Sequence, residues 1–162
     1  MEIQTPGMRL SLDAQLCFVL YGASRAFTNL YRPFLDSLGL TYPQYLVMLV
    51  LWEHDEVTVK ELGTTLRLTS GTLSPLLKRL EARELLTRRR TTEDERSVTV
   101  TLTETGRQLR EGACPIPDQM LAATGMDLDQ MLELRSRLER LIESLDVGPE
   151  AKPGADAAQT GL

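Results

Sequence analysis

Apolar residues recur every three or four positions in the first quarter of the chain. The pattern runs from Ser11 to Leu38, which predicts one amphipathic helix over residues 11–38. Ser11 or Asp13 is suited to cap its start, and Gly39 stands where a helix commonly ends in a left-handed residue. A helix that begins at Ser11 places Cys17 beyond its first turn.

A second helix is predicted to begin at Thr41, a capping residue followed by a proline inside the first turn. Its apolar residues continue to Trp52 and lie on nearly every side of the helix. We therefore expect this helix to be central and buried.

Residues 58–102 carry the signals of two short helices and a hairpin. Thr58 and Glu61 have the spacing of a capping box. Helical spacing then appears within residues 69–83, at Leu73, Leu76, Leu77 and Leu80. Two strand-like runs, 85–90 and 97–102, flank a polar tip, and apolar and hydroxyl residues alternate in the second run. This order predicts a winged helix-turn-helix.

The C-terminal third is predicted to be helical, with one helix from Thr103 to about Gly112 and a second over 118–124. A third is capped by Asp127 and runs to about Leu145. Residues 1–10 are expected to be flexible, and residues 147–162, rich in Ala, Gly and Pro, to form a disordered tail. The predicted fold is mainly α with a small β-wing, in one domain over residues 11–146.

The terminal helices, 11–38 and those within 103–146, carry more apolar surface than a small winged helix can cover. They either wrap around their own domain or form a homodimer interface, and we favour the dimer. A two-fold dimer would place its two recognition helices about 34 Å apart, which matches successive major grooves of a palindromic site.

The charge pattern indicates binding to double-stranded DNA. The chain has a net charge of −5, yet between Arg67 and Arg90 seven basic residues face only two acidic ones. A basic island in an acidic protein is expected of a nucleic-acid reader. The residues predicted to contact bases and phosphates are Ser70, Thr72, Ser74, Lys78, Arg79, Arg88 and Arg90. The alternatives are a common structural helix pair and a solvated basic face.

Other classes of function have little support in the sequence. Two cysteines, Cys17 and Cys114, are too few for a disulfide scaffold, and one histidine, His54, makes a soft-metal site improbable. The sequence contains no glycine-rich phosphate loop and no nucleophile elbow, so no motif indicates an enzyme, and we expect no cofactor. No apolar run is long enough to span a bilayer, so a cytoplasmic protein is expected.

Several segments resemble the MarR family of winged-helix regulators, and more closely its organic hydroperoxide-sensing repressors. They are Leu16-Cys-Phe-Val-Leu-Tyr-Gly-Ala-Ser-Arg-Ala, Tyr31-Arg-Pro, Leu38-Gly-Leu-Thr-Tyr-Pro-Gln-Tyr, Ser70-Gly-Thr-Leu-Ser-Pro-Leu-Leu-Lys-Arg-Leu-Glu and Asp94-Glu-Arg. The resemblance covers about residues 12–145. The last motif is shared by the wider family, whereas the cysteine together with Leu-Thr-Tyr-Pro-Gln-Tyr is more specific to the peroxide sensors.

The resemblance implies a homodimeric repressor that leaves its operator when an organic hydroperoxide oxidises Cys17. It also implies that Tyr31 and Tyr42 hydrogen-bond to that sulfur. Arg96 would enter the minor groove, steadied by Asp94.

Residue spacing adds one inference to this picture. Cys17 and Tyr31 are 14 residues apart, which on one helix is about 21 Å of rise. That separation is too long for a hydrogen bond, so a Tyr31 that serves Cys17 must come from the other subunit. The alternative for Cys17 is a buried, inert thiol.

Cys114 departs from the family pattern, in which a resolving cysteine follows an Ile-Pro pair that here is Ile116-Pro117. Cys114 either resolves oxidised Cys17 or is a bystander, in which case Cys17 ends as a mixed disulfide with a small thiol. Three other functions are rivals to the peroxide-sensing repressor. They are a regulator released by a small aromatic acid, a thiol peroxidase, and an architectural protein that binds DNA without sequence preference.

Overall fold

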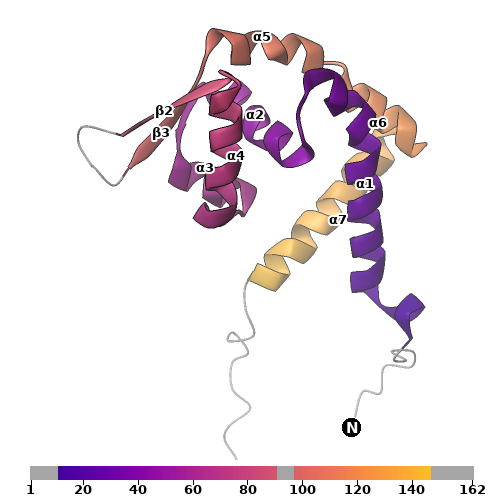
Figure 1. Cartoon of the computed structure of the whole chain (residues 1–162). Helices are drawn as coiled ribbons and strands as arrows, with labels where there is room; N and C mark the ends of the chain where they lie inside the picture. The colour runs from indigo at the N-terminus through magenta and orange to yellow at the C-terminus, as the bar shows by residue number, and fades with distance from the viewer. Residues whose placement is uncertain (1–10, 91–96, 147–162) are drawn as a thin grey trace, which may run out of the picture. The chain divides into compact units, whose positions relative to one another are not determined.

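The computed structural model describes residues 11–90 and 97–146. Its elements, in Figure 1, are α1 (Leu16–Leu38), α2 (Tyr42–His54), β1 (Glu56–Thr58), α3 (Val59–Leu66), α4 (Ser70–Ala82), β2 (Leu86–Arg90), β3 (Val98–Leu102), α5 (Glu104–Ala113), α6 (Ile116–Thr124) and α7 (Leu128–Asp146). This mainly helical chain with a small antiparallel sheet confirms the predicted fold class. The predicted wing residues Asp94 and Arg96, and the segments predicted to be flexible or disordered, lie outside the described residues.

The start of α1 differs from the prediction. Gln15 has an extended backbone, with φ −90° and ψ 117°, and separates a single 3-10 turn, Leu12–Ala14, from α1. The Gln15 side-chain amide donates to the Ser11 carbonyl at 3.4 Å and closes that turn. The helix therefore begins at Leu16, and Cys17 lies in its first turn rather than beyond it. At the other end, Gly39 has φ 64° and ends α1 as predicted.

Helix α2 is buried as its apolar composition indicated. Thr41 and Gln44 form a capping box at its start, with the Thr41 N–H donating to the Gln44 side-chain oxygen at 2.9 Å. Val47, Met48 and Leu51 are fully buried. His54 ends the helix with an exposed side chain, as predicted.

The winged unit has the predicted order of helix, helix and hairpin. Thr58 and Glu61 form the expected capping box at the start of α3. The sequence did not reveal β1, because a strand of three residues with one apolar side chain has no readable alternation. It pairs antiparallel with β3, with Val57 opposite Val100, and gives the sheet order β1-β3-β2.

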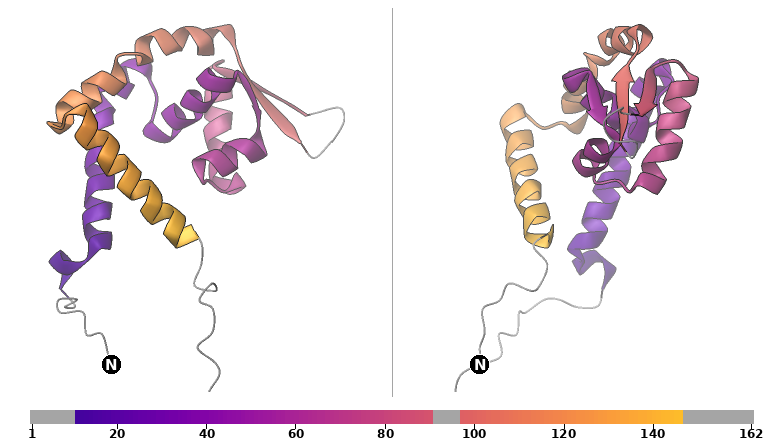
Figure 2. Two further views of the ribbon diagram at one scale, coloured as in Figure 1. Left: turned by 180° about the vertical axis from the view of Figure 1, so that it is seen from behind. Right: turned by 90° about the vertical axis from the view of Figure 1, so that its left-hand side faces the viewer.

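The core lies between the helices and the sheet of this unit. Leu62 of α3, Leu73 and Leu77 of α4, Leu86 of β2 and Val100 of β3 are buried almost completely. Helix α4 lies against β2, while α3 contacts β1 and β3. Figure 2 shows the helices and the hairpin from two further sides. Burial of each leucine contributes about 2 kcal/mol, so this core holds α4 in place while its other face stays in solvent.

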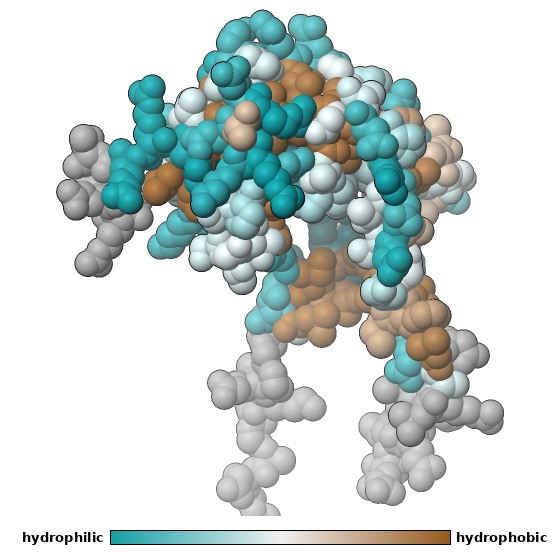
Figure 3. Space-filling view, viewed as in Figure 1, coloured by the Kyte–Doolittle hydropathy of each residue, from teal (hydrophilic) through white to brown (hydrophobic). Residues whose placement is uncertain are grey.

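The described part of the chain divides into two compact units, with the division between Met120 and Leu121. In the second unit, α7 is capped by Asp127, whose carboxylate accepts from the Gln130 N–H at 2.8 Å. No residue of α7 is buried. Exposed apolar side chains lie along α7, and others lie near the start of α1. Figure 3 shows apolar surface on both helices.

Among the described residues, no single helix has the length and apolar composition needed to cross a membrane. Helices α1 and α2 reach that length and composition only as a pair, with a bend of 69° between them.

Candidate functional site

One face of α4 is exposed and polar. The helix is capped by Thr69, whose hydroxyl accepts from the Thr72 N–H, and its leucine face is buried. The side chains that the sequence predicted for DNA contacts on this helix are all exposed, namely Ser70, Thr72, Ser74, Lys78 and Arg79. The buried stripe therefore turns the hydroxyls and both cations toward solvent together, as reading of a major groove requires.

The arginines of β2 differ from one another. Arg88 donates from its backbone N–H at 3.1 Å and from its guanidinium to the Glu81 carboxylate, and its side chain is only 25% exposed. These bonds lower the pKa of Glu81 below its ordinary value. The prediction that Arg88 binds phosphate therefore competes with an internal ion pair, whereas Arg89 and Arg90 are exposed.

Three tyrosines and a tryptophan form a cluster between α1 and α2. The ring of Tyr31 lies 4.9 Å from that of Tyr42 and 5.8 Å from that of Tyr45, between centroids. Tyr45 in turn lies 6.2 Å from Trp52. Burial raises the pKa of Tyr31, Tyr42 and Tyr45 above the ordinary 10.0. Their hydroxyls therefore remain protonated near neutral pH and can donate hydrogen bonds.

The structure does not bring Cys17 to these tyrosines within one chain. Cys17 is the second residue of α1 and is exposed, whereas Tyr31 lies 14 residues further along the same helix, about 21 Å away. Cys17 is therefore not buried within its own chain, unlike the buried, inert thiol of the alternative. The same position puts the sulfur near the positive end of the helix dipole, which favours negative charge.

Cys114 follows the last residue of α5 and is also exposed. It lines a shallow pocket of about 240 Å³ together with Tyr45 and Trp52. Cys114 is thus next to one end of the tyrosine cluster, a placement that its position in the sequence did not reveal.

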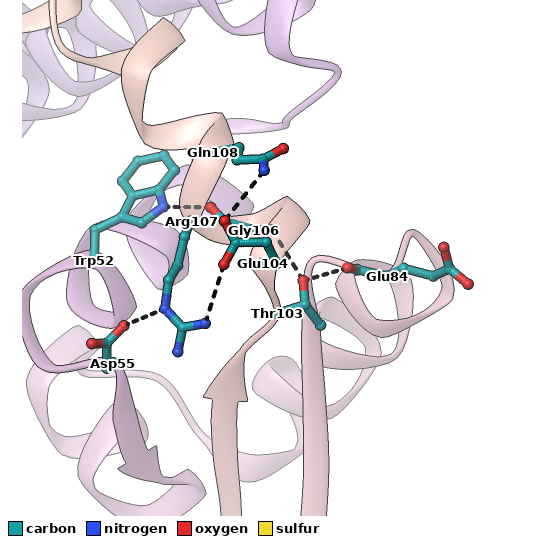
Figure 4. A network of polar contacts seen from close by, with 8 residues as sticks. All are labelled: Trp52, Asp55, Glu84, Thr103, Glu104, Gly106, Arg107 and Gln108. Atoms are coloured by element: carbon teal, nitrogen blue, oxygen red, sulfur yellow. Dashed lines mark hydrogen bonds and ion pairs between the residues drawn. The ribbon is translucent and has the colours of Figure 1, made fainter.

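The start of α5 is held to the winged unit by a network of polar contacts (Figure 4). The Trp52 indole N–H donates to the Gly106 carbonyl at 2.8 Å, and Arg107 Nε donates to the Asp55 carboxylate at 3.1 Å. The Thr103 hydroxyl donates to the Glu84 carbonyl at 2.5 Å. These bonds join α5 to the end of α2 and to the turn after α4.

The residues predicted for the sensor site did not include Tyr45 or Trp52. Residue spacing could have indicated that they join the aromatic cluster. Tyr42, Tyr45 and Trp52 are separated by three and seven residues and therefore share one helix face. Within residues 11–90 and 97–146, no three His, Cys, Asp or Glu side chains come together as metal ligands would.

Comparison with known proteins finds transcriptional regulators. Residues 29–112 match the sequence profile of the transcriptional regulator family SarA/Rot. Over 136 residues the chain is 49% identical to an organic hydroperoxide resistance transcriptional regulator of Bacillus subtilis, a match that covers 84% of this chain and 92% of that one.

Among solved structures, reduced AbfR bound to DNA, a protein of Staphylococcus epidermidis, superposes with a TM-score of 0.70 at 36% identity. Overoxidized AbfR bound to DNA superposes with a TM-score of 0.68 at 36% identity. Each covers 83% of this chain and 94% of the AbfR chain.

Proposed function

Because this chain belongs to the MarR family of winged-helix transcriptional regulators, in its organic hydroperoxide-sensing branch, we propose that it is a homodimeric, cytoplasmic repressor that senses organic hydroperoxides through Cys17. In the reduced state it binds a palindromic operator through the exposed face of α4 and through the wing. Oxidation of Cys17 then releases the operator.

The observation that carries this proposal is the placement of Cys17 relative to the tyrosines. The thiol is exposed in the first turn of α1, while Tyr31 lies about four helical turns further along α1 and packs there against Tyr42 of α2. A second copy of the chain, bound through the uncovered apolar faces of α1 and α7, can bring its Tyr31 and Tyr42 to this sulfur. The sensor site is thus shared between subunits.

The chemistry requires a thiolate and hydrogen-bond donors. The Cys17 thiolate attacks the terminal peroxide oxygen, an S–O bond forms, and the O–O bond breaks. Sulfur is oxidised by two electrons to the sulfenic acid, and the peroxide is reduced to an alcohol. The departing alkoxide takes its proton from water or from a tyrosine hydroxyl.

Operator release demands a large change in free energy. Emptying an operator that is occupied 99:1 requires about 5.5 kcal/mol of difference between the two states. One new oxygen atom per subunit can supply this only by breaking packed contacts. A sensor site shared between subunits meets this requirement, because oxidation there acts on the spacing of the two α4 helices.

The placement of Cys114 favours a role in resolving the oxidised sensor. Cys114 and Tyr45 line one pocket, and the ring of Tyr45 lies 5.8 Å from that of Tyr31. A Cys17 sulfur bound at Tyr31 would therefore lie near the partner's exposed thiol. Condensation of sulfenic acid with that thiol expels water and forms a disulfide.

The test is operator binding by wild type and Cys17→Ser at fixed salt, with and without an organic hydroperoxide. Both proteins should bind when untreated, and only wild type should be released. If both are released, Cys17 is not the sensor. If both stay bound, a small aromatic acid is the next inducer to examine. Steady turnover of hydroperoxide with a thiol reductant would instead indicate a thiol peroxidase.

A further inference from the structure

Arg83 joins the end of the recognition helix α4 to the turn between α1 and α2. It is the residue directly after α4, and its guanidinium donates to the carbonyls of Leu38, at 3.1 Å, and Gly39. These residues lie 45 and 44 positions earlier in the chain. Arg83 is one of the seven basic residues between Arg67 and Arg90, yet its side chain is engaged away from the exposed face of α4.

The two carbonyls that Arg83 binds end helix α1. The last turn of α1 has no basic residue of its own, and the Leu35 and Asp36 carbonyls are taken by backbone N–H groups from the Gly39–Leu40 turn. The Leu38 and Gly39 carbonyls carry the negative end of the helix dipole. A guanidinium fork from another helix satisfies both, so the end of α4 caps the end of α1.

Gly39 shows how closely the two elements approach. Its φ of 64° is left-handed, and a Cβ at this position would lie 2.8 Å from Arg83 Nη2. Glycine is thus suited to this position both for its backbone conformation and for the space that the guanidinium occupies.

The same turn after α4 also contacts α5. The Glu84 carbonyl accepts from the Thr103 hydroxyl, and the Leu85 carbonyl accepts from the Thr103 N–H at 3.2 Å. The turn of residues 83–85 therefore touches α1 through Arg83 and α5 through its carbonyls. Helix α1 carries Cys17 and Tyr31, and Tyr31 lies seven residues, about two turns, before Leu38.

We propose that Arg83 is a positioning residue that fixes the recognition helix relative to α1. It thereby sets the spacing of the two recognition helices in the dimer and passes a shift of α1 on to α4. The role of Arg83 in the response to oxidation rests on the proposed function. Its effect on the spacing of the two recognition helices requires only that the protein binds DNA as a dimer.

The test compares wild type, Arg83→Gln and Arg83→Lys on an operator selected from random DNA. Arg88→Gln is the matched control, because it removes an arginine whose ion pair with Glu81 stays inside the winged unit. The first readout is the ratio of affinities for the selected operator and for operators with one base pair added or removed between half-sites. The second is the ratio of Kd values with Cys17 oxidised and reduced.

Arg83→Gln should lower both ratios by about 2- to 30-fold, the range expected for loss of one coupling contact. Arg83→Lys, which keeps the charge without the fork, should fall between it and wild type. Arg88→Gln should leave both ratios as in wild type, whatever its effect on affinity. Circular dichroism melting confirms that each variant is folded.

If Arg83→Gln changes affinity and leaves the spacing ratio unchanged, Arg83 is an ordinary helix cap and the proposal is overturned. If wild type itself is not released by hydroperoxide, the sensing function fails, and the spacing ratio still decides the role of Arg83. If Arg83→Gln loses spacing discrimination but keeps the full oxidation ratio, the coupling half of the proposal is wrong.

Discussion

The rings of Tyr31 on α1 and Tyr42 on α2 lie 4.9 Å apart between centroids, tilted by 46°. This pair brings two phenols from different helices into one half-buried place, and burial raises the pKa of both. Two protonated hydroxyls side by side are suited to stabilise a thiolate and the alkoxide that leaves the hydroperoxide when its O–O bond breaks. Neither can reach the Cys17 of its own chain, so the pair serves a partner subunit in the proposed site.

Replacing either tyrosine by phenylalanine keeps the ring and removes the hydroxyl donor. Tyr31→Phe and Tyr42→Phe should each slow oxidation of Cys17 by roughly tenfold or more, the value of one hydrogen bond to a charged group. The measurement is the rate of thiol loss against hydroperoxide concentration. Tyr21→Phe is the control, because Tyr21 lies on the same helix but is exposed and bonds Arg25. Equal oxidation rates in wild type and the three variants would show that Tyr31 and Tyr42 do not act in the sensor site.

The role proposed for Cys114 predicts a covalent dimer. After treatment with hydroperoxide, wild type should run as a disulfide-linked dimer on a non-reducing gel. Cys114→Ser should run as a monomer whose mass shows sulfenic acid or an adduct with a small thiol. A wild-type monomer carrying such an adduct would make Cys114 a bystander.

The exposed cations of α4 should govern the salt dependence of operator binding. Lys78→Ala and Arg79→Ala should each make the negative slope of log K against log salt shallower by about one unit, because each loses one phosphate contact. Arg137→Ala on α7 is the control, since that arginine is exposed and pairs with Glu133. An unchanged slope in the α4 variants would mean that this face does not meet the DNA backbone.

Gly106 stands where α5 crosses the turn after α4. A Cβ there would lie 2.0 Å from the Leu85 carbonyl oxygen, which is itself bonded to the Thr103 N–H. Gly106→Ala should therefore destabilise the fold by about 1–3 kcal/mol, although alanine favours helices. Gly71→Ala, whose Cβ meets only ordinary contact at 3.9 Å, should be neutral or stabilising. Denaturant unfolding of both variants measures the difference, and equal stability would contradict this packing.

The ion pair of Glu81 with Arg88 predicts a loss of stability in acid. The pKa of Glu81 is lowered in the folded chain by its bonds to Arg88. A carboxylate with a lowered folded pKa stabilises the fold above its ordinary pKa of 4.5, and this contribution is lost as pH falls below that value. The Tm difference between wild type and Glu81→Gln should therefore shrink below pH 4.5. In an Arg88→Gln background the same substitution should lose this pH dependence, and persistence there would assign it to another group.

Local patterns in the sequence predicted most of the helices and their ends. The helix ends are formed by contacts within four residues, as between Thr58 and Glu61, between Asp127 and Gln130, and at Gly39. Such contacts can be predicted from the sequence without knowledge of the fold. The leucines of α4 predicted its buried face for the same reason. Periodicity also indicated the apolar faces of α1 and α7, although the break at Gln15 interrupts an otherwise continuous pattern.

Tertiary structure decided which groups meet across long separations. Arg83 binds Leu38, Trp52 binds Gly106, and Tyr31 packs on Tyr42, and no spacing rule connects such pairs. It also divided the basic island, because Arg83 and Arg88 have partners inside the fold whereas Lys78 and Arg79 face solvent. Charge along a chain shows how many cations a segment holds. Which of them remain available to DNA depends on the carboxylates and carbonyls that packing of the helices brings within reach.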